Sequence, residues 1–128
     1  MPLFAFLFVF AAALFAADTP ARAETLAGSW SGGGAVHYSD RRERAKCRAT
    51  YSRVSGTFYR MSASCATPSG RVDQTATLNR VGKNVYAGSF YNKQYNVSGS
   101  IQVRLSGNTQ QVNLRGSVGG GSFKLRRR

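Results

Sequence analysis

Apolar and polar side chains alternate residue by residue over most of the chain after Gly28, and clusters of Gly, Asn or Ser interrupt the alternation about every 8 to 12 residues. In the clearest stretch, residues 95–105, the odd-numbered positions are apolar or glycine and the even-numbered positions are polar. Successive side chains of a β-strand point to opposite faces, whereas a helix repeats every 3.6 residues. No helical repeat is sustained after Gly28, so the sequence predicts an all-β domain with one buried and one solvated face.

The alternation predicts eight strands, at residues 29–38, 46–54, 58–65, 72–80, 84–91, 95–105, 110–115 and 121–125. A sheet of eight short antiparallel strands has two exposed edges, and closing it into a barrel removes both. We therefore expect a small eight-stranded, calycin-like up-and-down barrel, with a flattened β-sandwich as the alternative.

The interior of such a barrel is just wide enough for side chains or one small ligand. The side chains predicted to face inward are Trp30, Val36, Tyr51, Tyr59, Met61, Leu78, Tyr86, Phe90, Ile101, Val103, Val112, Leu114, Phe123 and Leu125. Gly88 and Gly99 also occupy inward positions, and strand bending or close packing is a better explanation for them than a hollow interior.

The two cysteines test the register of one hairpin. If Ser55-Gly56-Thr57 forms a three-residue turn, Cys47 lies directly opposite Cys65, at a separation that a disulfide bridges. We therefore predict a disulfide between them. A metal site is not expected, because Cys47, Cys65 and the single His37 supply too few ligands for a closed zinc site.

Residues 3–17 form an unbroken apolar run, which is too short to span a bilayer comfortably. Pro20 and the small-residue pattern Ala21-Arg22-Ala23 follow it, as at a signal-peptide cleavage site. We expect residues 1–23 to be a signal peptide and residues 24–128 to be a single exported domain, periplasmic or secreted, without a transmembrane segment. An uncleaved amphiphilic anchor is the alternative.

Gly28-Ser29-Trp30 resembles the Gly-x-Trp start of calycin-type barrels, which include lipocalins, avidins and bacterial metalloprotease inhibitors. In that group the tryptophan plugs the closed end of the barrel, often against a basic residue of the last strand. The resemblance implies this role for Trp30, with Arg126 or Arg127 as its partner. The segments at residues 45–52, 69–76 and 88–92 are also similar to a family of small exported proteins of Gram-negative bacteria, which brings no assigned activity.

Few residues are suited to acid–base catalysis. Beyond the predicted signal peptide the titratable candidates are Glu24, His37, Asp40, Glu43 and Asp73. Nothing resembling a nucleophile elbow surrounds any serine. The chain has two glycine triplets, at residues 32–34 and 119–121, and neither is followed by a phosphate-binding lysine or helix. We therefore expect no enzymatic activity and no cofactor.

Charge is the clearest functional signal in the sequence. The chain of 128 residues has 18 Lys and Arg against 5 Asp and Glu, a net charge of +13. The predicted signal peptide contains one basic and one acidic residue, so the excess belongs to the domain. The candidate anion-binding residues are Arg41, Arg42, Arg44, Lys46 and Arg48, a basic run that joins the first two predicted strands, and Arg126, Arg127 and Arg128 in the tail.

Such an excess of cations attracts polyanions, although it also serves solubility. The leading hypothesis is a monomeric binding protein for an anionic partner, such as lipopolysaccharide, anionic lipid, glycan or an acidic protein. Export makes nucleic acid a less natural partner. The alternatives are an inhibitor of a secreted hydrolase, acting through a tail at residues 24–27, and a carrier of a small hydrophobic ligand inside the barrel.

Overall fold

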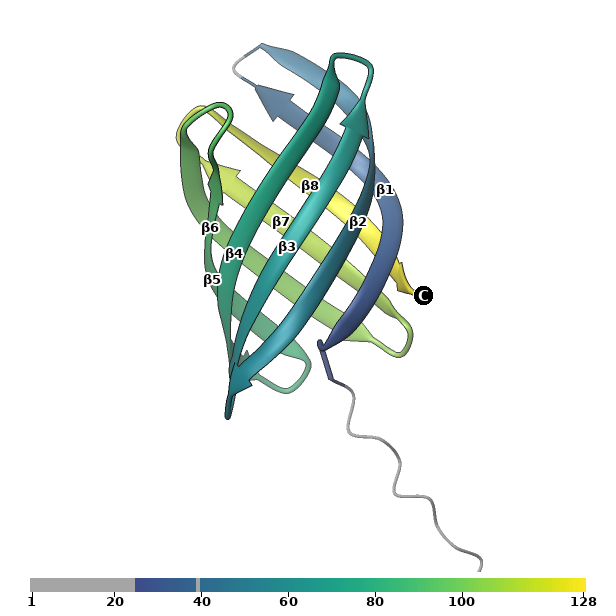
Figure 1. Ribbon diagram of the computed structural model, residues 1–128, viewed down its shortest axis with the longest axis vertical. Helices are drawn as coiled ribbons and strands as arrows, with labels where there is room; N and C mark the ends of the chain where they lie inside the picture. Colours follow the sequence, from purple (N-terminus) through teal and green to yellow (C-terminus); the bar gives the residue numbers. More distant parts are fainter. Residues whose placement is uncertain (1–24, 39) are drawn as a thin grey trace, which may run out of the picture.

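The computed structural model describes residues 25–38 and 40–128. The predicted signal peptide, residues 1–23, lies outside the described residues, as does Glu24. The described chain consists of eight antiparallel strands in sequence order (Figure 1): β1 (Gly28–Tyr38), β2 (Arg41–Ser55), β3 (Phe58–Thr67), β4 (Gly70–Gly82), β5 (Val85–Asn92), β6 (Val97–Ser106), β7 (Thr109–Gly116) and β8 (Gly119–Arg127).

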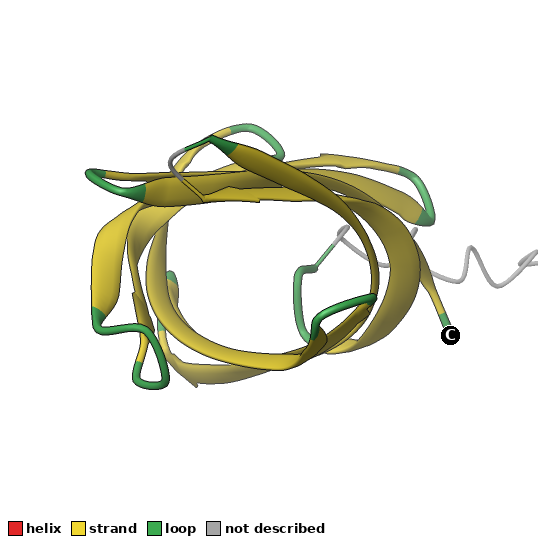
Figure 2. Cartoon of the chain, turned by 90° about the horizontal axis from the view of Figure 1, so that it is seen from above, coloured by secondary structure: helices red, strands yellow, loops and turns green. Residues whose placement is uncertain are grey.

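The sheet is closed. Each strand pairs with its neighbours in the sequence, and β1 also pairs with β8, from Trp30 opposite Arg127 to Tyr38 opposite Gly119. Seen along its length, the molecule is a continuous oval ring of strands (Figure 2). The up-and-down barrel is therefore confirmed, and the alternative of a flattened β-sandwich is wrong, because closure pairs the two edges that a sandwich leaves free.

The predicted strands are all present, but two boundaries differ in ways that matter for the surface. β2 begins at Arg41 and not at Lys46 as predicted, so residues 41–45, expected in the connection between the first two strands, belong to a strand. β6 begins at Val97, and Tyr95, predicted on the inward face of that strand, lies in the preceding turn with 51% of its surface exposed. Asn96 has a φ of 51°, a left-handed conformation that ends the extended pattern.

The interior is filled with side chains. All fourteen residues predicted to face inward are buried, and Leu26 and Val72 join them. Gly88 and Gly99 mark places where neighbouring strands approach closely: a Cβ atom at Gly88 would lie 1.8 Å from the carbonyl oxygen of Thr77, and one at Gly99 would lie 2.0 Å from that of Arg115. These glycines therefore permit tight strand curvature and do not line a hollow.

The predicted disulfide is present. Cys47 on β2 lies directly opposite Cys65 on β3, with Cα atoms 4.1 Å apart, and both residues are buried inside the barrel. The turn itself differs from the prediction. Gly56 and Thr57 alone form it, and an irregularity between Arg53 and Ser55 restores the predicted register. The bulge explains how a shorter turn yields the same cysteine pairing.

Candidate anion-binding face

Trp30 lies at the end of the barrel where the chain enters β1. Its side chain is completely buried, and its indole Nε1 donates a hydrogen bond to the carbonyl oxygen of Leu26 at 3.1 Å. The guanidinium group of Arg127 lies 4.2 Å from the ring centroid of Trp30 and donates to the carbonyl oxygens of Ala27 and Thr25, at 2.9 and 2.6 Å. Residues 25–27 are therefore folded across this end of the barrel and held there.

The outer surface of β2 presents a row of cations. Ala45, Cys47 and the other odd-numbered residues of this part of β2 point inward, whereas Arg42, Arg44, Lys46 and Arg48 are all exposed. Side chains on one face of a strand are two residues, or about 6.8 Å, apart. The four cations therefore span about 20 Å along the barrel.

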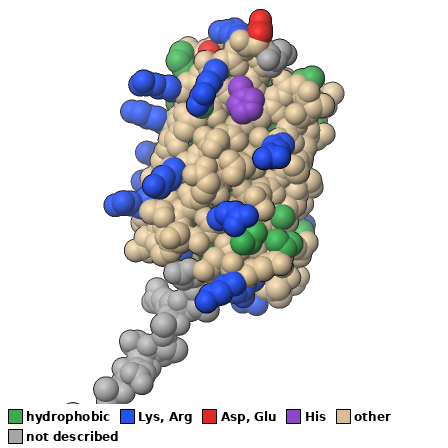
Figure 3. Space-filling model, turned by 180° about the vertical axis from the view of Figure 1, so that it is seen from behind, with side chains coloured by type: hydrophobic (Ala, Val, Ile, Leu, Met, Phe, Trp, Pro, Cys, Tyr) green, Lys and Arg blue, Asp and Glu red, His purple; other side chains and the backbone are tan. Residues whose placement is uncertain are grey.

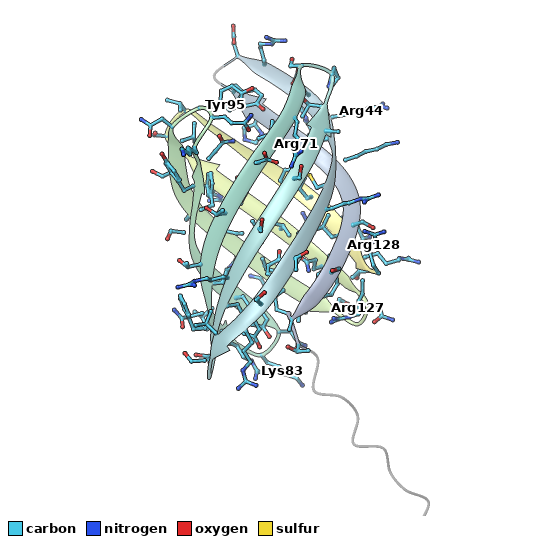
Figure 4. All side chains as sticks on the ribbon, viewed as in Figure 1. Arg44, Arg71, Lys83, Tyr95, Arg127 and Arg128 are labelled. Atoms are coloured by element: carbon cyan, nitrogen blue, oxygen red, sulfur yellow. A yellow bond between two sulfur atoms is a disulfide. The ribbon has the colours of Figure 1, made fainter. Side chains whose placement is uncertain are left out.

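A second row of cations lies on β8, two strands away. Lys124, Arg126 and the terminal Arg128 are exposed and alternate with the buried Phe123 and Leu125. Lys and Arg side chains gather along one edge of the barrel in the view from behind (Figure 3), and Arg44 and Arg128 project from the same side of the molecule (Figure 4). The two rows thus share one face.

Strand β1 separates the two rows and brings cations into matched pairs. Arg48 on β2 and Arg126 on β8 lie on either side of Ser31. Lys46 and Lys124 lie in the same way on either side of Gly33. Because neighbouring strands are about 4.8 Å apart, the backbones of each cation pair are separated by about 10 Å. We call these three strands' outer surface the basic face.

A surface depression extends the basic face across β2 towards β4. It is lined by Ser31, Gly32, Gly33, Lys46, Cys47, Arg48, Ser64, Cys65, Ala66, Arg71 and Arg128. Arg71 lies beside Ala66, which lies beside Lys46, so a small residue again separates two cations. Arg71 and Lys124 are not among the anion-binding residues predicted from the sequence, since only the strand register places them beside the other cations.

Acidic side chains of the described residues stand at the margin of the basic face or away from it. Asp73 Oδ1 accepts a hydrogen bond from Arg71 Nε at 2.9 Å, and that hydrogen bond, with a second from Ser64, lowers the pKa of Asp73. Glu43 accepts from Arg41 Nη2 at 3.3 Å and from the Ser69 hydroxyl. No outward-facing residue of β8, β1 or β2 in the described chain is acidic.

The eight candidate anion-binding residues therefore divide. Arg42, Arg44, Lys46, Arg48, Arg126 and Arg128 point outward on the basic face or at its end. Arg41 is at the barrel rim, paired with Glu43, and Arg127 holds the closed end against Trp30. The predicted basic loop and tail are thus one continuous strand surface, because the first and last strands of a closed barrel are neighbours.

The barrel interior contains two small cavities, each of about 20 Å³, the room of roughly one water molecule. Gln74 lines both; it is 8% exposed, and its Oε1 atom has no hydrogen-bond partner. One cavity lies at the end opposite Trp30, where the rings of Tyr38 and Tyr95 are 5.6 Å apart. Tyr51, deeper inside, donates to Gln110 Oε1 at 2.7 Å, and burial raises the pKa of its phenol.

Metal-ligating side chains do not cluster in the part of the chain that the structure describes, where no group of three His, Cys, Asp or Glu residues is close enough to hold an ion. The same part contains no helix with the length and apolar character needed to cross a membrane.

The fold is similar to that of designed β-barrels. A redesigned barrel, mFAP1, solved bound to DFHBI, has a TM-score of 0.68 at 12% identity, covering 80% of this chain and 94% of its own. A de novo designed fluorescence-activating barrel has a TM-score of 0.64 at 14% identity, covering 83% of this chain and 96% of its own. No protein-family model and no curated protein matches the chain. The chain is thus a small eight-stranded antiparallel barrel resembling designed fluorescence-activating barrels, and its similarity to an exported Gram-negative family stays a prediction.

Proposed function

We propose that the basic face of β8, β1 and β2 binds an anionic partner outside the cytoplasm, and that this binding, without a catalytic step, is the function of the protein. The candidate partners share one chemistry, a surface or chain of negative groups: lipopolysaccharide phosphates, anionic lipid, acidic glycan or an acidic protein. The observation that carries the proposal is the pair of matched cation pairs, Arg48 with Arg126 and Lys46 with Lys124, across β1.

The arrangement is unfavourable for the isolated protein. The repulsion within cation pairs with backbones about 10 Å apart is strongest at low salt, where the Debye length exceeds that separation. No acid on the outward side of these strands, as far as the structure describes them, offsets it. An anion bound between the rows would relieve this repulsion and gain attraction from both sides.

The buried disulfide supports an extracytoplasmic location. Disulfides form and persist in oxidising compartments and are rare in the cytosol. The Cys47–Cys65 bridge lies inside the barrel of a small domain, where it contributes to stability. It is therefore consistent with a periplasmic or secreted protein.

Salt-dependent retention on a heparin column tests the proposal. The test variant replaces Arg44, Lys46 and Arg48 with Ser. A matched control replaces Lys83, Arg104 and Arg115, which are exposed on the β4–β5 turn, β6 and β7, and so loses the same charge. We expect the test variant to elute at much lower salt than the control variant. Equal elution of the two variants would show that net charge alone causes retention and would overturn the proposal.

A small ligand in the barrel is a second candidate function. The unpartnered Gln74 Oε1 beside both cavities and the similarity to designed barrels that bind a small molecule favour it. Each cavity has room for about one water molecule. A larger ligand at the end opposite Trp30 would therefore have to displace Tyr95, which lines the cavity there. Native mass spectrometry of the purified protein tests this: a co-purified small molecule lost in a Gln74→Leu variant supports a carrier, and bare protein counts against one.

The inhibitor alternative needs a tail that is free to enter a protease. Leu26 is completely buried, and Arg127 holds the carbonyl oxygens of Thr25 and Ala27, so this part of the tail is already bound by its own barrel. Inhibition across a metalloprotease panel, lost on deleting residues 24–27, would restore this alternative.

A further inference from the structure

On the basic face, the small side chains of β1 lie between the long side chains of β2 and β8, and we call this strip the trough. Its floor is the outer surface of β1, where Ser31, Gly33 and Ala35 carry no side chain larger than a hydroxymethyl group and are half-buried. Its walls are the long side chains of β2 and β8, which are exposed. A trough of this kind has room for one extended chain lying parallel to β1.

We propose that this trough binds a single linear acidic polysaccharide, an inference that rests on the proposed function and names its partner. Negative groups on both sides of an extended sugar chain would meet the matched cation pairs across Ser31 and Gly33. The floor adds the hydroxyl groups of Ser29 and Ser31, which hydrogen-bond well to sugar hydroxyls. Arg71, beyond β2, binds Asp73 through Nε and has its other guanidinium nitrogens to offer to a branch or a second chain.

The composition of the trough favours an acidic polysaccharide over a single-stranded nucleic acid. Proteins that bind single-stranded nucleic acids combine cations with aromatic side chains on which bases stack. The outward-facing positions of β8, β1 and β2 in the described chain include no Phe, Tyr or Trp, and the imidazole among them, His37, lies beside Arg42 near the end of β1 and away from the matched cation pairs. The exposed Tyr91 and Tyr95 belong to β5 and the turn that follows it. Beside the matched cation pairs at Ser31 and Gly33, therefore, the trough offers no ring of this kind for base stacking.

A membrane surface is also a poor match. Peripheral membrane proteins commonly add inserted apolar side chains to their cations. The large exposed apolar residues of the described chain are Val54, Val81, Tyr91, Tyr95 and Val118. Of these, Val54 alone belongs to a trough strand, and it lies beyond the part of β2 that pairs with β1, which ends at Tyr51. Lipid headgroups would reach the tips of the cations, whereas the floor between them would stay empty.

Filling the floor without changing the charge tests the inference. The variants are Ser31→Trp and Ala35→Trp, and the control is Thr77→Trp, an exposed outward position on β4. Binding is measured by calorimetry to a heparin-derived hexasaccharide and by co-sedimentation to vesicles of equal parts phosphatidylglycerol and phosphatidylcholine. We expect Ser31→Trp to weaken hexasaccharide binding about tenfold, because several ion pairs of modest energy are lost together. Ala35→Trp is expected to act in the same direction, and Thr77→Trp to have no effect.

The possible results separate the two proposals. If the wild-type protein binds neither probe in a salt-dependent way, the proposed function itself fails. If it binds but the floor variants bind like wild type, or lose hexasaccharide and vesicle binding equally, the trough inference fails and the basic face is only a charged surface. A single-stranded oligonucleotide of matched charge that binds more tightly than the hexasaccharide would also overturn the choice of ligand. Circular dichroism of each variant establishes that the barrel is intact.

Discussion

The guanidinium group of Arg127 lies 4.2 Å from the ring centroid of Trp30 and, with two of its nitrogens, donates to the carbonyl oxygens of Ala27 and Thr25. One side chain from the last strand thus fixes the first strand and the segment before it. The guanidinium group of Arg127 is bound by groups of the protein itself, whereas the side chain of the adjacent Arg126 is exposed to solvent.

Replacing Arg127 should therefore destabilise the barrel. Two hydrogen bonds from a charged donor and one cation–π contact are lost, and we expect Arg127→Ala to cost about 2–4 kcal/mol in the free energy of unfolding. Arg127→Lys should recover only part of this, because an ammonium group lacks the planar fork. Urea denaturation measures the difference. Arg126→Ala is the control, and we expect it to lower the free energy of unfolding by about 0.5 kcal/mol or less. An equal loss of stability in the two alanine variants would contradict the structural role of Arg127.

The close strand approach at Gly88 predicts a position-specific effect of alanine. A Cβ atom there would overlap the carbonyl oxygen of Thr77, so Gly88→Ala must push two paired strands apart. We expect Gly88→Ala to lower the free energy of unfolding by about 3 kcal/mol or more. At Gly82 the nearest atom to an added Cβ is 3.9 Å away, and Gly82→Ala should be almost neutral. Thermal denaturation of the two variants checks this pair, and similar stabilities would show that the curvature at Gly88 is not required.

The disulfide should contribute a definable part of the stability. The bridged residues are 18 apart in sequence, and a loop of that size corresponds to about 3 kcal/mol in the chain-entropy description. We expect the double variant Cys47→Ala, Cys65→Ala to unfold at a correspondingly lower denaturant concentration, and its midpoint to be unaffected by reductant. A wild-type midpoint that equals that of the variant would contradict this role.

Tyr51 predicts the direction of a pH effect. Burial raises the pKa of its phenol above the ordinary value of 10.0. Above about pH 10 the unfolded chain loses this proton while the folded chain keeps it, so stability is complete below that pH and falls by up to about 1.4 kcal/mol per pH unit above it.

Tyr51→Phe isolates this effect. At neutral pH the free energy of unfolding of the variant should be lower by about 1–3 kcal/mol, because Gln110 loses its hydrogen-bond partner. At alkaline pH this free energy should fall less steeply with pH than in the wild type. Tyr91→Phe, at a 45% exposed position, is the control and should follow the wild type. Urea titrations at several pH values measure both slopes, and parallel declines for wild type and Tyr51→Phe would contradict the prediction.

The sequence alone predicts the strands and the core, since alternation at period two identifies inward positions such as Ile101 and Val103 directly. It also predicts the pairing of Cys47 with Cys65, because a hairpin register follows from local turn geometry. It does not reveal that residues 41–45 belong to the same strand as residues 46–54. The inward positions there are filled by Glu43 and Ala45, which give a weak alternation, and the run of charges between them resembles a loop.

The basic face depends on contacts that no local pattern contains. Lys46 and Lys124 are far apart in the sequence. They lie on either side of Gly33 only because β8, the last strand, pairs with β1, the first. The register of that closure is set by packing of the whole barrel, including the contact between Arg127 and Trp30. Single residues of the face were therefore predictable as cations, whereas their pairing and the trough between them were not.

The most direct test of the basic face is a map of where an anion binds. Backbone amide shifts of the ¹⁵N-labelled domain are followed during titration with a heparin-derived hexasaccharide, at low and at high salt. We predict that the largest changes fall on Ser31, Gly33, Lys46, Arg48, Lys124 and Arg126, and that added salt removes them. Changes spread evenly around the barrel, or centred on the turn that contains Tyr95, would contradict the account.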